Sequence, residues 1–199
     1  MADNKGLAER HTADEGGAGA GRVPGGLPVA AAALTVTVAV YMALVAFGNI
    51  TDFGTNQQFV RHVLAMDTTF KDEDLMWRAI ESKALADAAY VLIIAWETLA
   101  ALVLLASGWQ WARALTRRGG DPAGAARARR TGSLGLVMVV LLFGLGFIAI
   151  GGEWFAMWQS SQWNGLAAAT RNLTLAGLAL VVTWLPGAVP TGGRIGRSS

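Results

Sequence analysis

The sequence predicts an all-α membrane protein built as a bundle of four transmembrane helices. Of its 199 residues, 53% are hydrophobic and 15% are charged, whereas soluble domains are about 25% charged. The mean hydropathy is positive, at +0.41. Four apolar stretches have about the 20-residue length that crosses the hydrocarbon core of a bilayer. Composition and span length therefore point to the same class of protein.

The predicted transmembrane domain covers residues 27–185, with spans at residues 27–47, 84–108, 133–150 and 166–185. Residues 1–26 and 186–199 are rich in Gly, Ala, Ser and charge, and we expect them to form unstructured tails because they have little to bury. A secretory signal peptide has a short basic region and a short apolar run. Here a long tail of mixed charge precedes a long apolar run, so we expect the first span to be retained.

The first half of the chain contains a polar and aromatic connection between its two spans. Pro28 suits the first turn of a helix, where its missing N–H costs nothing, and the cluster from Gly48 to Gly54 indicates a turn. In Thr55–Asp67 the apolar residues recur at helical spacing. This segment is predicted to be a short amphipathic helix at the membrane interface.

The second span runs into Trp109 and Trp111, which are typical of a membrane boundary, and then into a basic connection broken by Gly and Pro. Pro186 stops the fourth span. Lys and Arg are more frequent in the tails and the middle connection than in the other two connections. Because short cytoplasmic loops are the basic ones, we expect a protein of the cell membrane with both termini in the cytoplasm.

The two halves of the chain also resemble each other. In each, a span ends in a glycine turn, a polar and aromatic segment follows, and a second span ends in Trp. This similarity predicts two parallel helix-hairpin repeats, related by an axis along the membrane normal.

Glu97 and Arg171 are predicted to form an ion pair inside the bundle. They precede Trp109 and Trp184 by nearly equal numbers of residues, which places both about 18–20 Å from the inner surface. Asn172, Tyr90 or Tyr41 would satisfy the remaining polar groups. In the alternative, Arg171 extends outward and Glu97 is protonated between the helices.

The two outer connections hold most of the distinctive polar side chains. A shared site for a ligand, ion or partner at the outer face would draw on Asn49, Asp52, His62, Asp67, Glu153, Trp154 and Gln159. The alternative is that these segments only anchor the protein at the interface, where Trp and amphipathic helices are common.

Composition excludes several kinds of chemistry. The chain has no Cys, hence no disulfide and no thiolate metal site, and a net charge of +2 does not favour a nucleic-acid partner. A bis-His haem would need a second histidine at the membrane, and His11 in the tail does not supply one. No metal-ligand or catalytic constellation is recognisable. We therefore expect no metal, no cofactor and no enzymatic activity.

Two polar and aromatic blocks resemble a known family. The first contains Asn49, Asp52, Asn56, Phe59–Val60, His62–Leu64 and Met66–Thr69 and continues in Trp77–Ile80, and the second comprises Gly152–Phe155 with Met157–Ser160. They are similar to the family of predicted small integral membrane proteins called domain of unknown function 2165. The resemblance covers about residues 27–185. It implies a four-span protein of the bacterial inner membrane and no established activity.

We therefore expect a small multi-pass membrane protein acting as a non-catalytic accessory or structural subunit of a larger membrane complex. The alternative is a small oligomeric transporter or channel with Glu97 and Arg171 on the path. The expected partners are the lipid bilayer together with other membrane subunits or further copies of the chain. Water access along the Glu97 face separates the two readings, because a packed subunit is dry there.

Overall fold

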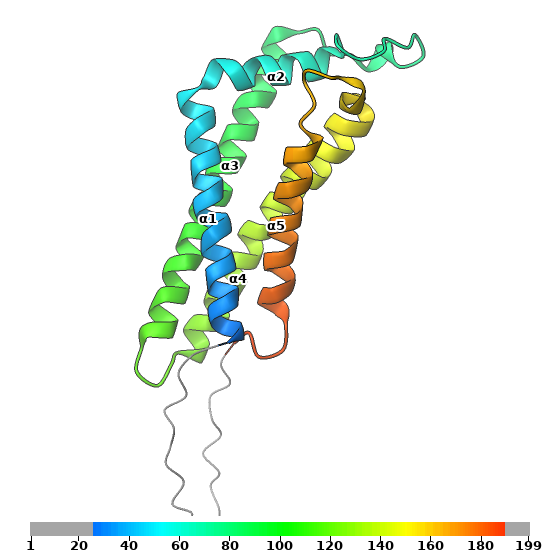
Figure 1. The fold of residues 1–199 in the computed structure, drawn as a ribbon. Helices are drawn as coiled ribbons and strands as arrows, with labels where there is room; N and C mark the ends of the chain where they lie inside the picture. The colour runs from blue at the N-terminus through cyan, green and yellow to red at the C-terminus, as the bar shows by residue number, and fades with distance from the viewer. Residues whose placement is uncertain (1–25, 190–199) are drawn as a thin grey trace, which may run out of the picture.

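The computed structural model describes residues 26–189 and shows a four-helix bundle with a shorter helix lying across one end (Figure 1). Four helices are long and apolar enough to cross a membrane, as predicted. The elements are α1 (Leu27–Thr51), α2 (Phe53–Ala65), η1 (Met76–Arg78), α3 (Lys83–Thr116), α4 (Pro122–Val140), η2 (Leu141–Trp154), η3 (Met157–Gln159) and α5 (Leu166–Trp184). The predicted tails, residues 1–26 and 186–199, lie outside the described residues except for Gly26 and residues 186–189.

The four long helices form a closed ring in which α1 packs on α3, α3 on α4, α4 and η2 on α5, and α5 on α1. We call the end crossed by α2 the α2 end. The opposite end, where the chain passes from α3 to α4, is the arginine end, and both ends of the described part of the chain lie there too (Figure 1). Each half thus contributes one span in each direction, while the predicted repeat symmetry stays a prediction.

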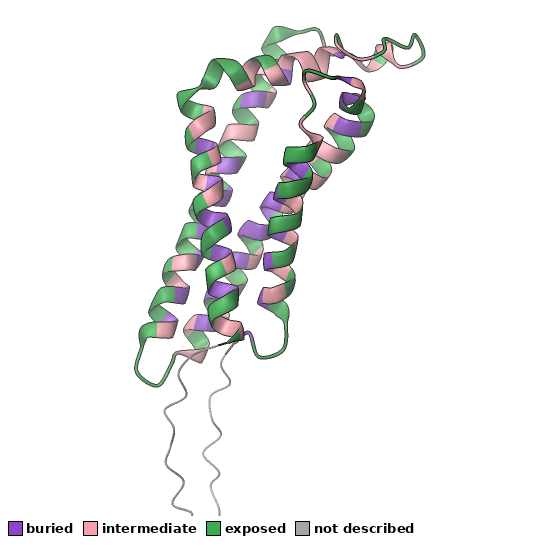
Figure 2. Cartoon of the chain, in the orientation of Figure 1, coloured by how far each residue is buried: buried purple, intermediate pink, exposed green. Residues whose placement is uncertain are grey.

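The centre of the bundle is built largely from small side chains. Ala39, Ala100, Ala101, Ala176 and Ala179 are each at most 4% exposed and pack with Met42, Leu104 and Leu136. Large apolar side chains such as Leu44, Leu92 and Leu102 instead point outward, so that burial alternates around each helix (Figure 2). Small residues inside and large ones outside are expected where the surrounding solvent is lipid, because they let helix backbones approach closely.

The third span is longer than predicted. Expected at residues 133–150, it runs as one helix from Pro122 to Trp154, so most of the basic connection is helical. Asp121 caps this helix, because its side chain accepts a hydrogen bond from Gly124 N at 2.8 Å. Ala125 and Ala128 then bury a face beside Ala31 and Trp111, which the Gly and Pro content of the segment did not reveal.

The second span is also longer than its predicted bounds, because α3 continues to Thr116. Trp109 is 66% exposed, whereas Trp111 is 1% exposed and belongs to the core at the arginine end. Of the two tryptophans predicted to mark the membrane boundary, Trp111 is therefore a core residue instead.

The last part of the third span, η2, is a π-helix, which the sequence did not predict. Phe155 N donates to Ile150 O, five residues back, at 3.0 Å. Such wider turns are rare and often accompany functional sites. Here η2 supplies Phe143 and Phe147 to the space beneath α2.

The predicted interfacial helix over residues 55–67 is present as α2 and lies across the bundle (Figure 1). It ends at Met66, which takes a left-handed conformation (φ 51°) and is 1% exposed beside Phe155 and Ala156. The two polar connections therefore pack against each other at the α2 end.

Candidate functional site

Glu97 lies on the inward face of α3 and is 2% exposed. The face continues along the helix through Ala100, Ala101, Leu104, Ser107 and Trp111, all buried. These residues recur every three or four positions, which is the repeat of one helix face. The sequence spacing therefore places Glu97 inside the bundle, as expected.

Asn49, near the end of α1, is the hydrogen-bond partner of Glu97. Its Nδ2 atom donates to Glu97 Oε2 at 2.5 Å, and its backbone oxygen accepts from the Tyr90 hydroxyl at 3.0 Å. Asn49 follows Met42 and Ala46 on the buried stripe of α1, and the turn predicted from Gly48 begins only after Thr51. One extra helical turn thus brings an amide to the carboxylate.

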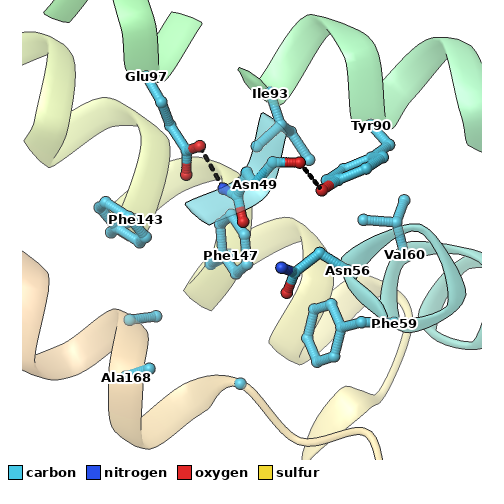
Figure 3. A pocket seen from close by; sticks show the side chains of 12 residues that line it. Asn49, Asn56, Phe59, Val60, Tyr90, Ile93, Glu97, Phe143, Phe147 and Ala168 are labelled. Atoms are coloured by element: carbon cyan, nitrogen blue, oxygen red, sulfur yellow. Dashed lines mark hydrogen bonds between the residues drawn. The ribbon is translucent and has the colours of Figure 1, made fainter. Parts of the chain in front are cut away.

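A cavity of about 190 Å³ separates Glu97 from α2. Its polar lining comes from Asn49, Asn56, Tyr90 and Glu97, and an aromatic lining comes from Phe59, Phe143 and Phe147. Gly165, Ala168 and Ala169 close it on the side of α5. Figure 3 shows Glu97 and Asn49 on one side of this space and Ala168 across from them. A volume of this size is sufficient for several water molecules or one small ligand.

The predicted pair between Glu97 and Arg171 is not formed. Arg171 is exposed, and among the described residues it takes part in none of the ion pairs, which involve Arg61, His62 and Arg117. The buried face of α5 runs through Ala169, Asn172, Ala176, Ala179 and Thr183. Arg171 is one residue, about 100° of helix rotation, away from that face. Depth counting had ignored this rotation.

Asn172 takes the inward position instead and accepts a hydrogen bond from the Tyr41 hydroxyl at 2.7 Å. It is 5% exposed. Tyr41 and Asn172, which were expected to support the ion pair, thus link α1 to α5 by a hydrogen bond that involves no charged group. The arrangement matches the alternative in which Arg171 points outward.

The residues predicted for a shared site at the α2 end separate into several local groups. His62 Nδ1 lies 2.7 Å from Asp67 Oδ2, and the His62 ring stacks on Trp163 at 4.6 Å between centroids. Asp52 accepts from the Thr55 hydroxyl at 2.9 Å and is exposed. These contacts fix the ends and one side of α2.

The other predicted residues tie the second connection to the first. Gln159 Oε1 accepts from Phe70 N at 2.9 Å, and the guanidinium of Arg78 lies 4.8 Å from the ring centre of Trp154. Glu153 is exposed. Of the seven residues, only Asn49 lines the Glu97 cavity, so the seven do not form one site. Within residues 26–189, no three His, Asp or Glu side chains converge as metal ligands.

Helix α2, the roof of the cavity, is held to α3 by a clamp that the sequence did not predict. Arg61 Nε and Nη2 each lie 2.7 Å from an oxygen of Asp87, and Gln57 Nε2 donates to the same carboxylate at 3.0 Å. The hydrogen bond to Asp87 raises the pKa of the Arg61 guanidinium above its usual range. Such a bidentate pair fixes orientation as well as distance.

Fold and site together define a four-helix integral membrane protein with a buried carboxylate facing a polar and aromatic cavity. The chain belongs to the family described as predicted small integral membrane protein (DUF2165), whose model matches residues 27–186. No curated protein and no solved structure matches the chain. The family description states the membrane class and assigns no activity, so the chemistry of the site is argued from its residues.

Proposed function

We propose that this protein binds a small cation at Glu97, which reaches the carboxylate from the α2 end. Glu97, 2% exposed at the wall of a cavity and hydrogen-bonded only to Asn49 among the described residues, carries the proposal. Carboxylates within a membrane span are costly and occur mainly on ion or substrate pathways. The site therefore favours the transporter or channel alternative over a dry, packed subunit, and we propose no enzymatic role.

The proposed direction of entry follows from the distribution of charge. The arginine end carries Arg113, Arg117, Arg118, Arg127, Arg129 and Arg130, and basic segments stay in the cytoplasm. We therefore propose a cell-membrane protein whose termini are cytoplasmic and whose α2 end faces outward. A cation would then enter beneath α2 from outside.

The accessory-subunit role is our second proposal, and Arg171 is the observation that favours it. Its side chain is exposed on the outside of α5, within a candidate membrane span, where an acidic group on a neighbouring subunit would offset its charge. We expect mild-detergent purification to recover stoichiometric partner subunits, and Arg171→Gln to reduce that recovery. Isolation of the chain free of other subunits would contradict this role.

Cysteine labelling tests the proposed cation site directly, because the chain has no native Cys. Ala168→Cys places a thiol in the cavity wall. In intact cells we expect an impermeant trimethylammonium methanethiosulfonate to modify it about tenfold faster than the sulfonate analogue, since the buried carboxylate attracts one reagent and repels the other. In an added Glu97→Gln background this preference should disappear.

Two cysteine variants serve as controls. In Ala167→Cys the replaced residue is exposed like its neighbour Ala168 but does not line the cavity, and in Ala179→Cys it lies in the core with 0% exposure. Neither should react with a charge preference that depends on Glu97. Equal rates for the two reagents at Ala168→Cys, or modification only from the cytoplasmic side, would contradict the proposed site or its orientation.

A further inference from the structure

We propose that the cation bound at Glu97 is an alkylated ammonium ion such as a tetramethylammonium or choline-type group. This inference rests on the proposed cation site and adds its chemical class. The aromatic lining is the observation behind it. The Phe143 and Phe147 ring centres are 5.3 Å apart, and those of Phe147 and Phe59 are 6.4 Å apart, so the three rings follow one another along the cavity.

The rings and the carboxylate line the same partly open cavity. Figure 3 shows Phe143 and Phe147 beside Glu97 and Asn49, with Phe59 further away on α2 next to Asn56. A cation within this cavity of about 190 Å³ would contact ring faces and remain near the negative charge. Aromatic rings and a carboxylate together are the chemistry that recognises quaternary ammonium groups, because their methyl groups pack on rings while the charge is spread over the surface.

The same lining offers too few oxygen ligands for a metal cation. Mg²⁺ and Ca²⁺ take six or more oxygen ligands. The side-chain oxygens of the lining come from Glu97, two asparagines and Tyr90, and the Tyr90 hydroxyl already donates to Asn49 O. Desolvating a hard ion against three phenyl rings leaves much of its coordination unsatisfied, whereas an alkylated ammonium is already weakly hydrated. The lining therefore selects the organic cation.

Small residues on α5 keep the space open. A Cβ atom added at Gly165 would lie 2.9 Å from Phe59 Cζ, so a side chain there would displace the ring. Ala168 and Ala169 line the adjoining turn. These small residues let Phe59 pack close to the start of α5, and none of them carries a long side chain into the cavity.

Calorimetry on the full chain in lipid nanodiscs tests the ligand class. Tetramethylammonium and choline should bind, and 3,3-dimethylbutan-1-ol, the uncharged isostere of choline, should bind at least about tenfold more weakly because it lacks the charge. Na⁺ and K⁺ should not compete at equal concentration. Phe147→Leu and Phe59→Leu should each weaken tetramethylammonium binding about 5- to 30-fold, the range of a desolvated cation–π contact.

Phe70→Leu is the matched control, since Phe70 is 72% exposed and packs on Trp158 away from the cavity; it should leave binding unchanged. Glu97→Gln should abolish binding. If the Glu97-dependent labelling preference holds but the ring variants bind tetramethylammonium as wild type does, or K⁺ competes equally, the ligand class is wrong and the cation site stands. If the labelling preference is also missing, the proposed function itself fails.

Discussion

Gly135→Ala is expected to destabilise the protein by about 1–3 kcal/mol, the usual cost of overpacking a core. A Cβ atom at this position would lie 2.6 Å from Leu104 Cγ and 2.8 Å from its Cδ2. Leu104 is 0% exposed and belongs to the core of the bundle, so its side chain is surrounded by other residues. The added methyl group would therefore push α4 away from α3 where Gly135 packs on Leu104.

Thermal unfolding of the purified protein in one fixed detergent measures the effect. Gly177→Ala is the control, because a Cβ atom there meets nothing within 4 Å and alanine is favoured over glycine in a helix by up to about 1 kcal/mol. This control should be neutral or stabilising. Leu104→Ala should partly rescue Gly135→Ala, since it frees the space that the methyl group needs. Equal stability of both glycine variants would rule out the close α3–α4 contact.

Asn49→Leu is expected to cost about 1–3 kcal/mol, the penalty of leaving a buried hydrogen-bonding group unsatisfied. Leucine has a similar shape, but it leaves the Glu97 carboxylate without its donor. Because an unpaired buried polar group is costly while a pair of apolar groups is not, Asn49→Leu combined with Glu97→Leu should cost less than the sum of the two single changes.

The matched control is Asn56→Leu, which removes an amide from the same cavity lining. Among the described residues, the Asn56 side chain makes no hydrogen bond. This substitution should change the free energy of unfolding little. Arg171→Gln should likewise behave additively with Glu97→Gln, since the two side chains do not meet. Strict additivity between Asn49 and Glu97, or strong coupling between Glu97 and Arg171, would contradict the observed geometry.

Much of the architecture could be predicted because its signals are local. The four spans follow from the length and composition of single stretches, and α2 follows from the helical spacing of its apolar residues. The ends of the spans were less accurate. Residues 122–132 contain Arg, Gly and Pro, and they are helical because Ala125 and Ala128 find a buried surface beside Trp111, which no local signal reveals.

The residues of the site also divide into those that the sequence predicted and those that it did not. Glu97 was identified because a carboxylate in an apolar span is unusual wherever its partners lie. Its partner was assigned wrongly to Arg171, since counting residues gives depth and leaves helix rotation undetermined. Asn49 was assigned to an outer site because the glycine that precedes it resembled a turn. The aromatic lining passed unnoticed, because Phe143 and Phe147 lie in a uniformly apolar span.

The sequence alone determined the membrane class, the helical fold and the burial of one carboxylate, because each depends on the transfer of a contiguous stretch from water into lipid. Tertiary structure decided what the carboxylate faces. The rotation of α5, the extra turn of α1 and the π-helical turns of η2 bring an amide from α1 and phenyl rings from α2 and η2 to one cavity beside α3. Those positions depend on packing between distant segments, and side-chain periodicity within a single helix does not encode them.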